Sequence, residues 1–100
     1  MHSSPFAHLF QGSEHQPFHY DGGQPGAVLV HGFPGTPAEM LPLGQALHQA
    51  GWTVHGLLLP GFGVQLETLM KRKHTEWVGA LQLAYRAMSR CHDPVILVGF

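Results

Sequence analysis

Short apolar runs separated by amphipathic stretches make up most of this chain. Three runs are rich in valine and leucine and lie near glycine or proline, which is typical of strands covered on both faces. They are AVLVH (27–31), WTVHGLLLP (52–60) centred on Thr53 to Leu57, and PVILVGF (94–100). A shorter edge strand is expected around PFHY (17–20).

A helix is predicted between the first two runs. Thr36 can cap it, Pro37 suits the first helical position, and Glu39 would complete a capping box. Pro42 lacks an N–H, so we expect a tight or offset first turn, and Gly51 would end the helix in the left-handed conformation. The expected buried stripe is Met40, Leu43, Leu47 and Ala50.

A short helical turn is expected within residues 65–73, and a second long helix from Thr75. The order strand, helix, strand, helix, strand predicts an α/β fold with a parallel sheet and right-handed crossovers. We therefore assign residues 1–26 to a lead-in and residues 27–100 to the α/β unit. The expected buried face of the second helix is Trp77, Leu81, Ala84, Tyr85 and Met88.

Composition excludes several classes of function. With 44 % hydrophobic residues the 100-residue chain can form a core, whereas 11 % charged residues and a net charge of −1 predict no nucleic-acid partner. One cysteine, Cys91, and no visible signal peptide favour a cytoplasmic location. The apolar runs are too short for a membrane span, which needs about 20 residues.

Nine histidines raise the question of a metal site, but their spacing argues against one. His15 and His19 are separated by Pro17, which would break a helix presenting both rings on one face. The remaining histidines within the predicted elements stand alone in the sequence. We expect no metal and no cofactor.

The loop HGFPG carries the candidate chemistry, because it follows a buried strand and precedes a capped helix. Gly32 and Gly35 allow a tight turn at this point. A phosphate-binding loop would need G-x-G-x-x-G or a G-K-[ST] ending, and neither is present. The remaining interpretation is an oxyanion site, in which a backbone N–H faces the charge that grows on an acyl oxygen.

The segment AVLVHGFPGTPAEMLPLGQALHQAGWTVHGLLLPGFG (27–63) resembles the amino-terminal part of the α/β-hydrolase superfamily. The resemblance is greatest to its bacterial carboxylesterase and monoacylglycerol lipase-like branch. It extends from Pro17 to Phe100 and includes PFHYDGG, the T-E-W of Thr75 to Trp77, and the last strand. It implies a partial α/β-hydrolase fold, with a three-stranded, mostly parallel sheet and crossover helices, truncated before the nucleophile elbow is complete.

In that family the last strand enters the elbow G-x-S-x-G, and Gly99 and Phe100 match its first two positions. The resemblance implies a serine at the next position, with the acid and the histidine of the triad later in the chain. It also implies that Phe33 gives an oxyanion-hole N–H, while His31, Gly32, Pro34 and Gly35 shape the loop. The family often reads G-H-G after the second strand, where this chain has Gly61-Phe62-Gly63.

The implied function is hydrolysis of a small-molecule carboxylic ester, although the 100-residue chain itself is expected to be inactive. HGFP also resembles epoxide hydrolases and dehalogenases of the same fold, in which an aspartate is the nucleophile. A third interpretation is a truncated, inactive chain or a hydrolase-fold protein that only binds. The residue after Phe100 distinguishes the two enzyme classes.

Overall fold

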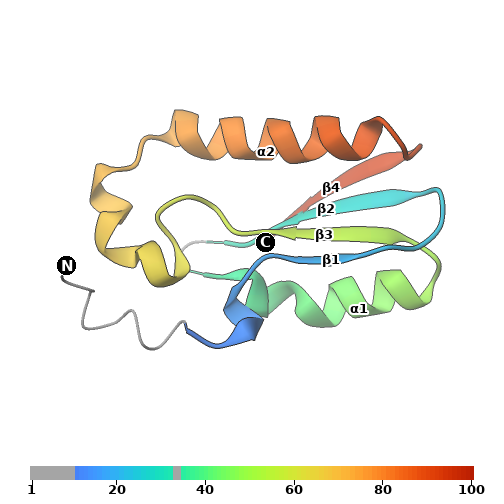
Figure 1. The fold of residues 1–100 in the computed structure, drawn as a ribbon, viewed down its shortest axis with the longest axis horizontal. Coiled ribbons are helices and arrows are strands. Elements are labelled where there is room, and N and C mark those ends of the chain that lie inside the picture. The colour runs from blue at the N-terminus through green and yellow to red at the C-terminus, as the bar shows by residue number, and fades with distance from the viewer. Residues whose placement is uncertain (1–10, 33–34) are drawn as a thin grey trace.

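The computed structural model describes residues 11–32 and 35–100, which form a mixed four-stranded sheet between two helices. Helices α1 (Leu41–Gln49) and α2 (His74–Ser89) lie on opposite faces of the sheet (Figure 1). The strands are β1 (Phe18–Tyr20), β2 (Gly26–Val30), β3 (Thr53–Leu57) and β4 (Val95–Gly99). Three 3-10 segments complete the described elements: η2 (Ser13–His15), η3 (Pro37–Met40) and η4 (Gly63–Lys71).

The strand order is β1-β3-β2-β4, with β2 parallel to both β3 and β4 and β1 antiparallel to β3. This arrangement confirms the α/β prediction and all three parallel strands. The fourth strand, β1, is the edge strand expected around PFHY. Because β2, β3 and β4 are parallel, their carboxyl ends meet at one edge of the sheet, where ligands bind in open α/β sheets.

The core is centred on β2, as expected for a strand covered on both faces. Ala27, Val28 and Leu29 have no exposed surface, and Met40 and Val54 are equally buried beside them. At the β1 edge the ring of Phe18 lies over two glycines. A Cβ atom built on Gly44 or Gly56 would come within 2.7 Å or 2.1 Å of that ring, so only glycine leaves room for it.

The first helix begins as the prolines predict, but its capping differs from the prediction. The Thr36 hydroxyl accepts a hydrogen bond from the Ala38 N–H at 3.3 Å, and η3 forms the tight turn expected before α1. The capping box is wrong, because the Glu39 carboxylate accepts a hydrogen bond from the loop amide of Gly32 instead. Gly51 has a φ of 98°, in the left-handed conformation predicted for the helix end.

Two predicted buried positions are exposed. Ala50, the residue directly after α1, is exposed, and within α1 Gly44 is buried. Tyr85 is 40 % exposed because it lies beside Leu97 of β4, an edge strand, and Leu97 is itself 49 % exposed. The prediction that the terminal run is covered on both faces is therefore wrong for the described residues.

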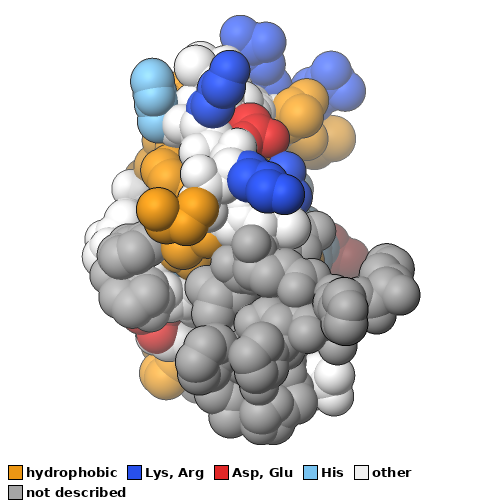
Figure 2. Space-filling model, turned by 90° about the vertical axis from the view of Figure 1, so that its left-hand side faces the viewer, with side chains coloured by type: hydrophobic (Ala, Val, Ile, Leu, Met, Phe, Trp, Pro, Cys, Tyr) orange, Lys and Arg blue, Asp and Glu red, His pale blue; other side chains and the backbone are white. Residues whose placement is uncertain are grey.

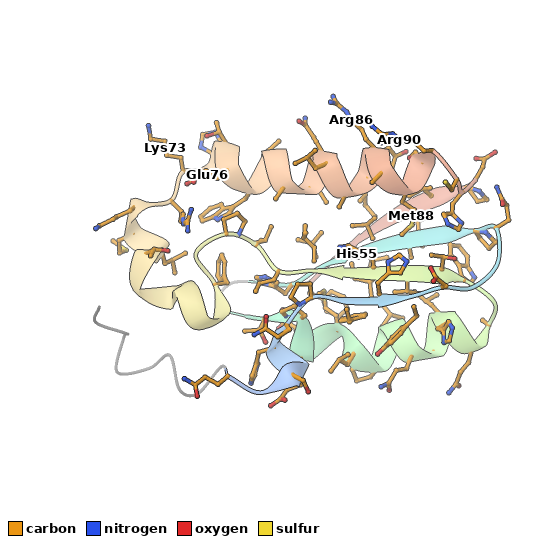
Figure 3. The ribbon with its side chains drawn as sticks, in the orientation of Figure 1. His55, Lys73, Glu76, Arg86, Met88 and Arg90 are labelled. Carbon is orange, nitrogen blue, oxygen red and sulfur yellow. The ribbon has the colours of Figure 1, made fainter. Side chains whose placement is uncertain are left out.

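Helix α2 begins one residue before the predicted Thr75, and its first turn is fixed by Glu76. The Glu76 carboxylate accepts a hydrogen bond from the Lys73 N–H at 2.8 Å and pairs with Arg72 at 3.1 Å (Figure 3). The hydrogen bond from the Lys73 N–H, followed by that from Arg72, lowers the pKa of Glu76. A carboxylate at a helix amino terminus is also favoured by the helix dipole.

Candidate active site at the carboxyl ends of the strands

The loop after β2 meets the end of β4 at the carboxyl edge of the sheet. The Phe100 N–H donates a hydrogen bond to the Val30 carbonyl at 3.0 Å, and Gly99 is in register with Val30. A Cβ atom built on Gly32 would lie 2.8 Å from the Phe100 carbonyl oxygen. Glycine at position 32 therefore allows the loop to lie directly against Phe100, the residue after β4.

His31 joins this loop to the segment after β3. Its ring is almost fully buried, with 3 % of the residue exposed. Nε2 accepts a hydrogen bond from the Leu59 N–H at 3.0 Å, and Nδ1 donates to the Gly32 carbonyl at 3.1 Å. Because Nε2 is an acceptor, the proton of the neutral ring is on Nδ1. Both ring nitrogens thus bind backbone groups, which braces the loop.

Burial also keeps His31 uncharged. Desolvation lowers the pKa of His31, and this effect outweighs the hydrogen bond to the Gly32 carbonyl and the charge of Glu39, which both raise it. A protonated ring would lose the Nε2 lone pair that accepts the Leu59 N–H. The neutral form is therefore the one that fits this arrangement.

Glu39 is a site residue that the sequence analysis missed. Its carboxylate accepts a hydrogen bond from the Gly32 N–H, although it lies seven residues further along the chain. Gly35 makes the approach possible, since a Cβ atom there would lie 2.6 Å from Glu39 Oε1 and 2.6 Å from the Gly32 carbonyl oxygen. A close spacing of two glycines with a carboxylate one helical turn later is the only sequence signal for this contact.

Phe62 packs in the loop after β3, at the middle position of Gly61-Phe62-Gly63. Only 3 % of the residue is exposed, and its ring meets His31 edge to face, with the centroids 4.9 Å apart. On its other side lies Trp77, at 5.9 Å between centroids. The Trp77 indole N–H donates a hydrogen bond to the Pro60 carbonyl at 2.8 Å, which ties the loop to α2.

The structure therefore brings together five of the predicted site residues: His31, Gly32, Gly35, Gly99 and Phe100. The other two, Phe33 and Pro34, lie outside the described residues. Figure 2 views the molecule from the side at which β2, β3 and β4 end. Lys and Arg side chains gather at the top of this view, beside exposed hydrophobic groups, and Met70 near the end of η4 is 94 % exposed.

In residues 11–32 and 35–100, as they are arranged, no group of three or more His, Cys, Asp or Glu side chains could hold a metal ion. No helix in that part of the chain is long and apolar enough to cross a membrane.

Comparisons with known proteins support the assignment made from the sequence. The chain is 33 % identical over 84 residues to a thermostable monoacylglycerol lipase of Bacillus sp. strain H-257. It is 36 % identical over 62 residues to a carboxylesterase of Bacillus subtilis strain 168. These matches cover 84 % and 62 % of this chain but only 34 % and 25 % of the relatives. No family model matches the chain.

A solved structure shows the same fold. It is described with LipS and LipT, two metagenome-derived lipolytic enzymes, and it superposes with a TM-score of 0.82 at 25 % identity. The match covers 88 % of this chain and 36 % of that protein. This chain thus spans about a third of the length of the relatives it matches, or less. Sequence and structure together confirm its resemblance to the α/β-hydrolase superfamily, in the carboxylesterase and monoacylglycerol lipase-like branch.

Proposed function

We propose that this chain supplies the first part of the active site of a serine hydrolase that acts on carboxylic esters. The observation that carries the proposal is the contact between the HGFPG loop and the end of β4, where Gly32 lies against Phe100. An oxyanion hole needs its donors close to the carbonyl that the nucleophile attacks. Loop and elbow must therefore meet at one edge of the sheet, as these two segments do.

In the proposed mechanism the backbone N–H of Phe33 is one oxyanion donor. Gly99 and Phe100 are the first two residues of the elbow, and a serine follows them, with the acid and the histidine of the triad beyond residue 100. The serine attacks the ester carbonyl while the histidine takes its proton, and water later releases the acyl group. The second oxyanion donor is the N–H of the residue after the serine.

His31, Gly32, Pro34 and Gly35 act in this proposal as the frame of the oxyanion loop. Removal of one oxyanion donor costs on the order of 3 kcal/mol of barrier in comparable enzymes. Phe33→Ala keeps the backbone N–H, so turnover is expected to fall by less than about a thousandfold. A greater loss in a folded variant would show that the Phe33 ring, rather than its amide, makes the decisive contact.

The substrate class rests on the similar proteins, whose descriptions are those of a monoacylglycerol lipase, a carboxylesterase and a lipolytic enzyme. The test compares the 100-residue chain with the protein translated from its whole reading frame, using a short-chain aryl ester. We expect turnover only from a protein that continues past Phe100. A fluorophosphonate probe should then label a serine directly after Phe100.

Three outcomes would overturn the proposal. Turnover by the purified 100-residue chain would place a nucleophile within these residues. An aspartate after Phe100, together with hydrolysis of an epoxide or a haloalkane, would establish the aspartate-nucleophile alternative. A folded longer protein with neither label nor turnover would indicate a hydrolase fold that only binds its ligand.

A further inference from the structure

A pair of histidines lies on the sheet face that α2 covers, on a different part of the sheet from the loop after β2. His19 of β1 and His55 of β3 are directly opposite each other in the antiparallel register. Their Nδ1 atoms are 3.3 Å apart. Directly opposed residues on antiparallel strands have their Cβ atoms about 4.5–5.5 Å apart, so the two strands themselves hold the rings together.

Asp21 determines which nitrogen of His19 can act as a ligand. Its carboxylate oxygen lies 2.9 Å from Nε2 of His19. A carboxylate accepts hydrogen bonds, so Nε2 carries the proton and Nδ1, the atom that faces His55, keeps its lone pair. A carboxylate behind an imidazole is the usual second partner of metal-binding histidines, because it fixes the tautomer and raises the basicity of the ring.

The separation of the two nitrogens suits a shared metal ion. Zinc binds imidazole nitrogen at about 2.0–2.1 Å with tetrahedral geometry, which places two such nitrogens about 3.3–3.4 Å from each other. The observed 3.3 Å agrees with this value without any movement of the backbone. An N–H···N hydrogen bond between the rings would give a similar distance, and the experiment below separates the two.

The pair borders a cavity with room for an ion and its water ligands. A cavity of about 300 Å³ is lined by His19, His55, Cys91 and His92, together with three apolar residues of α2. Figure 3 shows His55 and Met88, one of those apolar residues, between the sheet and α2. Imidazole nitrogen is a donor that suits zinc and similar borderline metals.

We propose that His19 and His55 bind a borderline divalent metal ion through their Nδ1 atoms, with Zn²⁺ as the reference ion. The two histidines are the protein ligands of the site, and water completes the coordination. The ion would clamp the edge strand β1 to β3. This site is independent of the proposed ester hydrolysis, because none of its residues belongs to the loop after β2 or to the elbow.

The test is a titration of the metal-free protein with Zn²⁺ in competition with a chromophoric chelator. His19→Gln and His55→Gln should each weaken the tightest Zn²⁺ binding at least tenfold, because each removes a ligand. Asp21→Asn should weaken it about 10- to 100-fold through the loss of the carboxylate behind His19. His74→Gln, at the exposed start of α2, is the matched control and should leave the affinity unchanged.

Thermal unfolding gives a second measurement that does not depend on any enzymatic activity. Zn²⁺ should raise the unfolding temperature of the parent protein and of His74→Gln. The increase should be smaller in His19→Gln, His55→Gln and Asp21→Asn. If His55→Gln impairs folding of the metal-free protein, Asp21→Asn provides the test instead. The Asp21 side chain is 94 % exposed, so this substitution should leave folding intact. Zn²⁺ binding that is equal in the parent and in the His19→Gln/His55→Gln double variant would overturn the proposal, as would no binding at all.

Discussion

Gly32→Ala tests whether the loop after β2 depends on close approach to the end of β4. The added Cβ atom would lie 2.8 Å from the Phe100 carbonyl oxygen and 3.2 Å from its carbonyl carbon. Both are backbone atoms, so no side chain can rotate away and the loop or the strand end must shift. Overpacking of this kind costs about 1–3 kcal/mol of folding free energy.

Part of that cost is offset, because alanine restricts the unfolded chain more than glycine and this favours folding by about 0.4–1 kcal/mol. The expected net loss of unfolding free energy is about 1–2 kcal/mol. Gly79→Ala is the matched control, since a Cβ atom there meets nothing within 4 Å in the middle of α2. That change should stabilise the protein by up to about 1 kcal/mol through helix propensity.

The assay is denaturant unfolding of the parent and both variants under the same conditions, with the slopes compared to confirm that the same surface unfolds. The two alanine variants should differ by about 1–3 kcal/mol, with Gly32→Ala the less stable. Equal stability of Gly32→Ala and the parent would refute the claim that the loop is packed against Phe100. A gain similar to that of Gly79→Ala would refute it more strongly.

Three further changes probe the groups around His31. In the unfolded chain His31 takes up a proton as the pH falls below about 6.5, whereas burial lowers its pKa in the folded state. The free energy of unfolding, measured from pH 8 to 5, should therefore decline below about pH 6.5. His31→Gln should make this decline less steep. Phe62→Ala should destabilise the protein by about 3–5 kcal/mol in the same unfolding assay, as expected for a buried ring, and a loss below 1 kcal/mol would contradict its packing role. Trp77→Phe keeps a ring but removes the donor to Pro60, so a loss of about 0.5–1.5 kcal/mol is expected, and no change would mean that water replaces the bond.

Local sequence patterns predicted most of the backbone because local physics determines those features. Thr36 caps the 3-10 turn η3 that leads into α1, Pro42 follows that turn, and Gly51 has a positive φ just after the helix, each through contacts within a few residues. The apolar run of β2 likewise indicated a strand buried on both faces, and Val28 at its centre has no exposed surface. In β4 the same kind of run gave the wrong expectation, because burial depends on which neighbours a strand has.

The side-chain partners could not be predicted in the same way. Glu39 has the spacing of a capping-box residue, yet its carboxylate binds the amide of Gly32, which reaches it only once the loop has folded back. His19 and His55 are 36 residues apart and become neighbours through the register of β1 and β3. A sequence pattern records neither contact, because both arise from the pairing of segments that are distant in the chain.

The register between β2 and β4 explains why the candidate active site forms at this edge of the sheet. Val30 pairs with Gly99, so the two strands end together, and the residues that follow them must share the same small space. His31 is turned inward to the Leu59 N–H, and Gly32 has no side chain to keep the loop away from Phe100. A one-residue slip in a parallel pair would move each side chain to the other face of the sheet. It would also separate the loop from the strand end, so the register of β2 and β4 is a requirement of the proposed chemistry as well as of the fold.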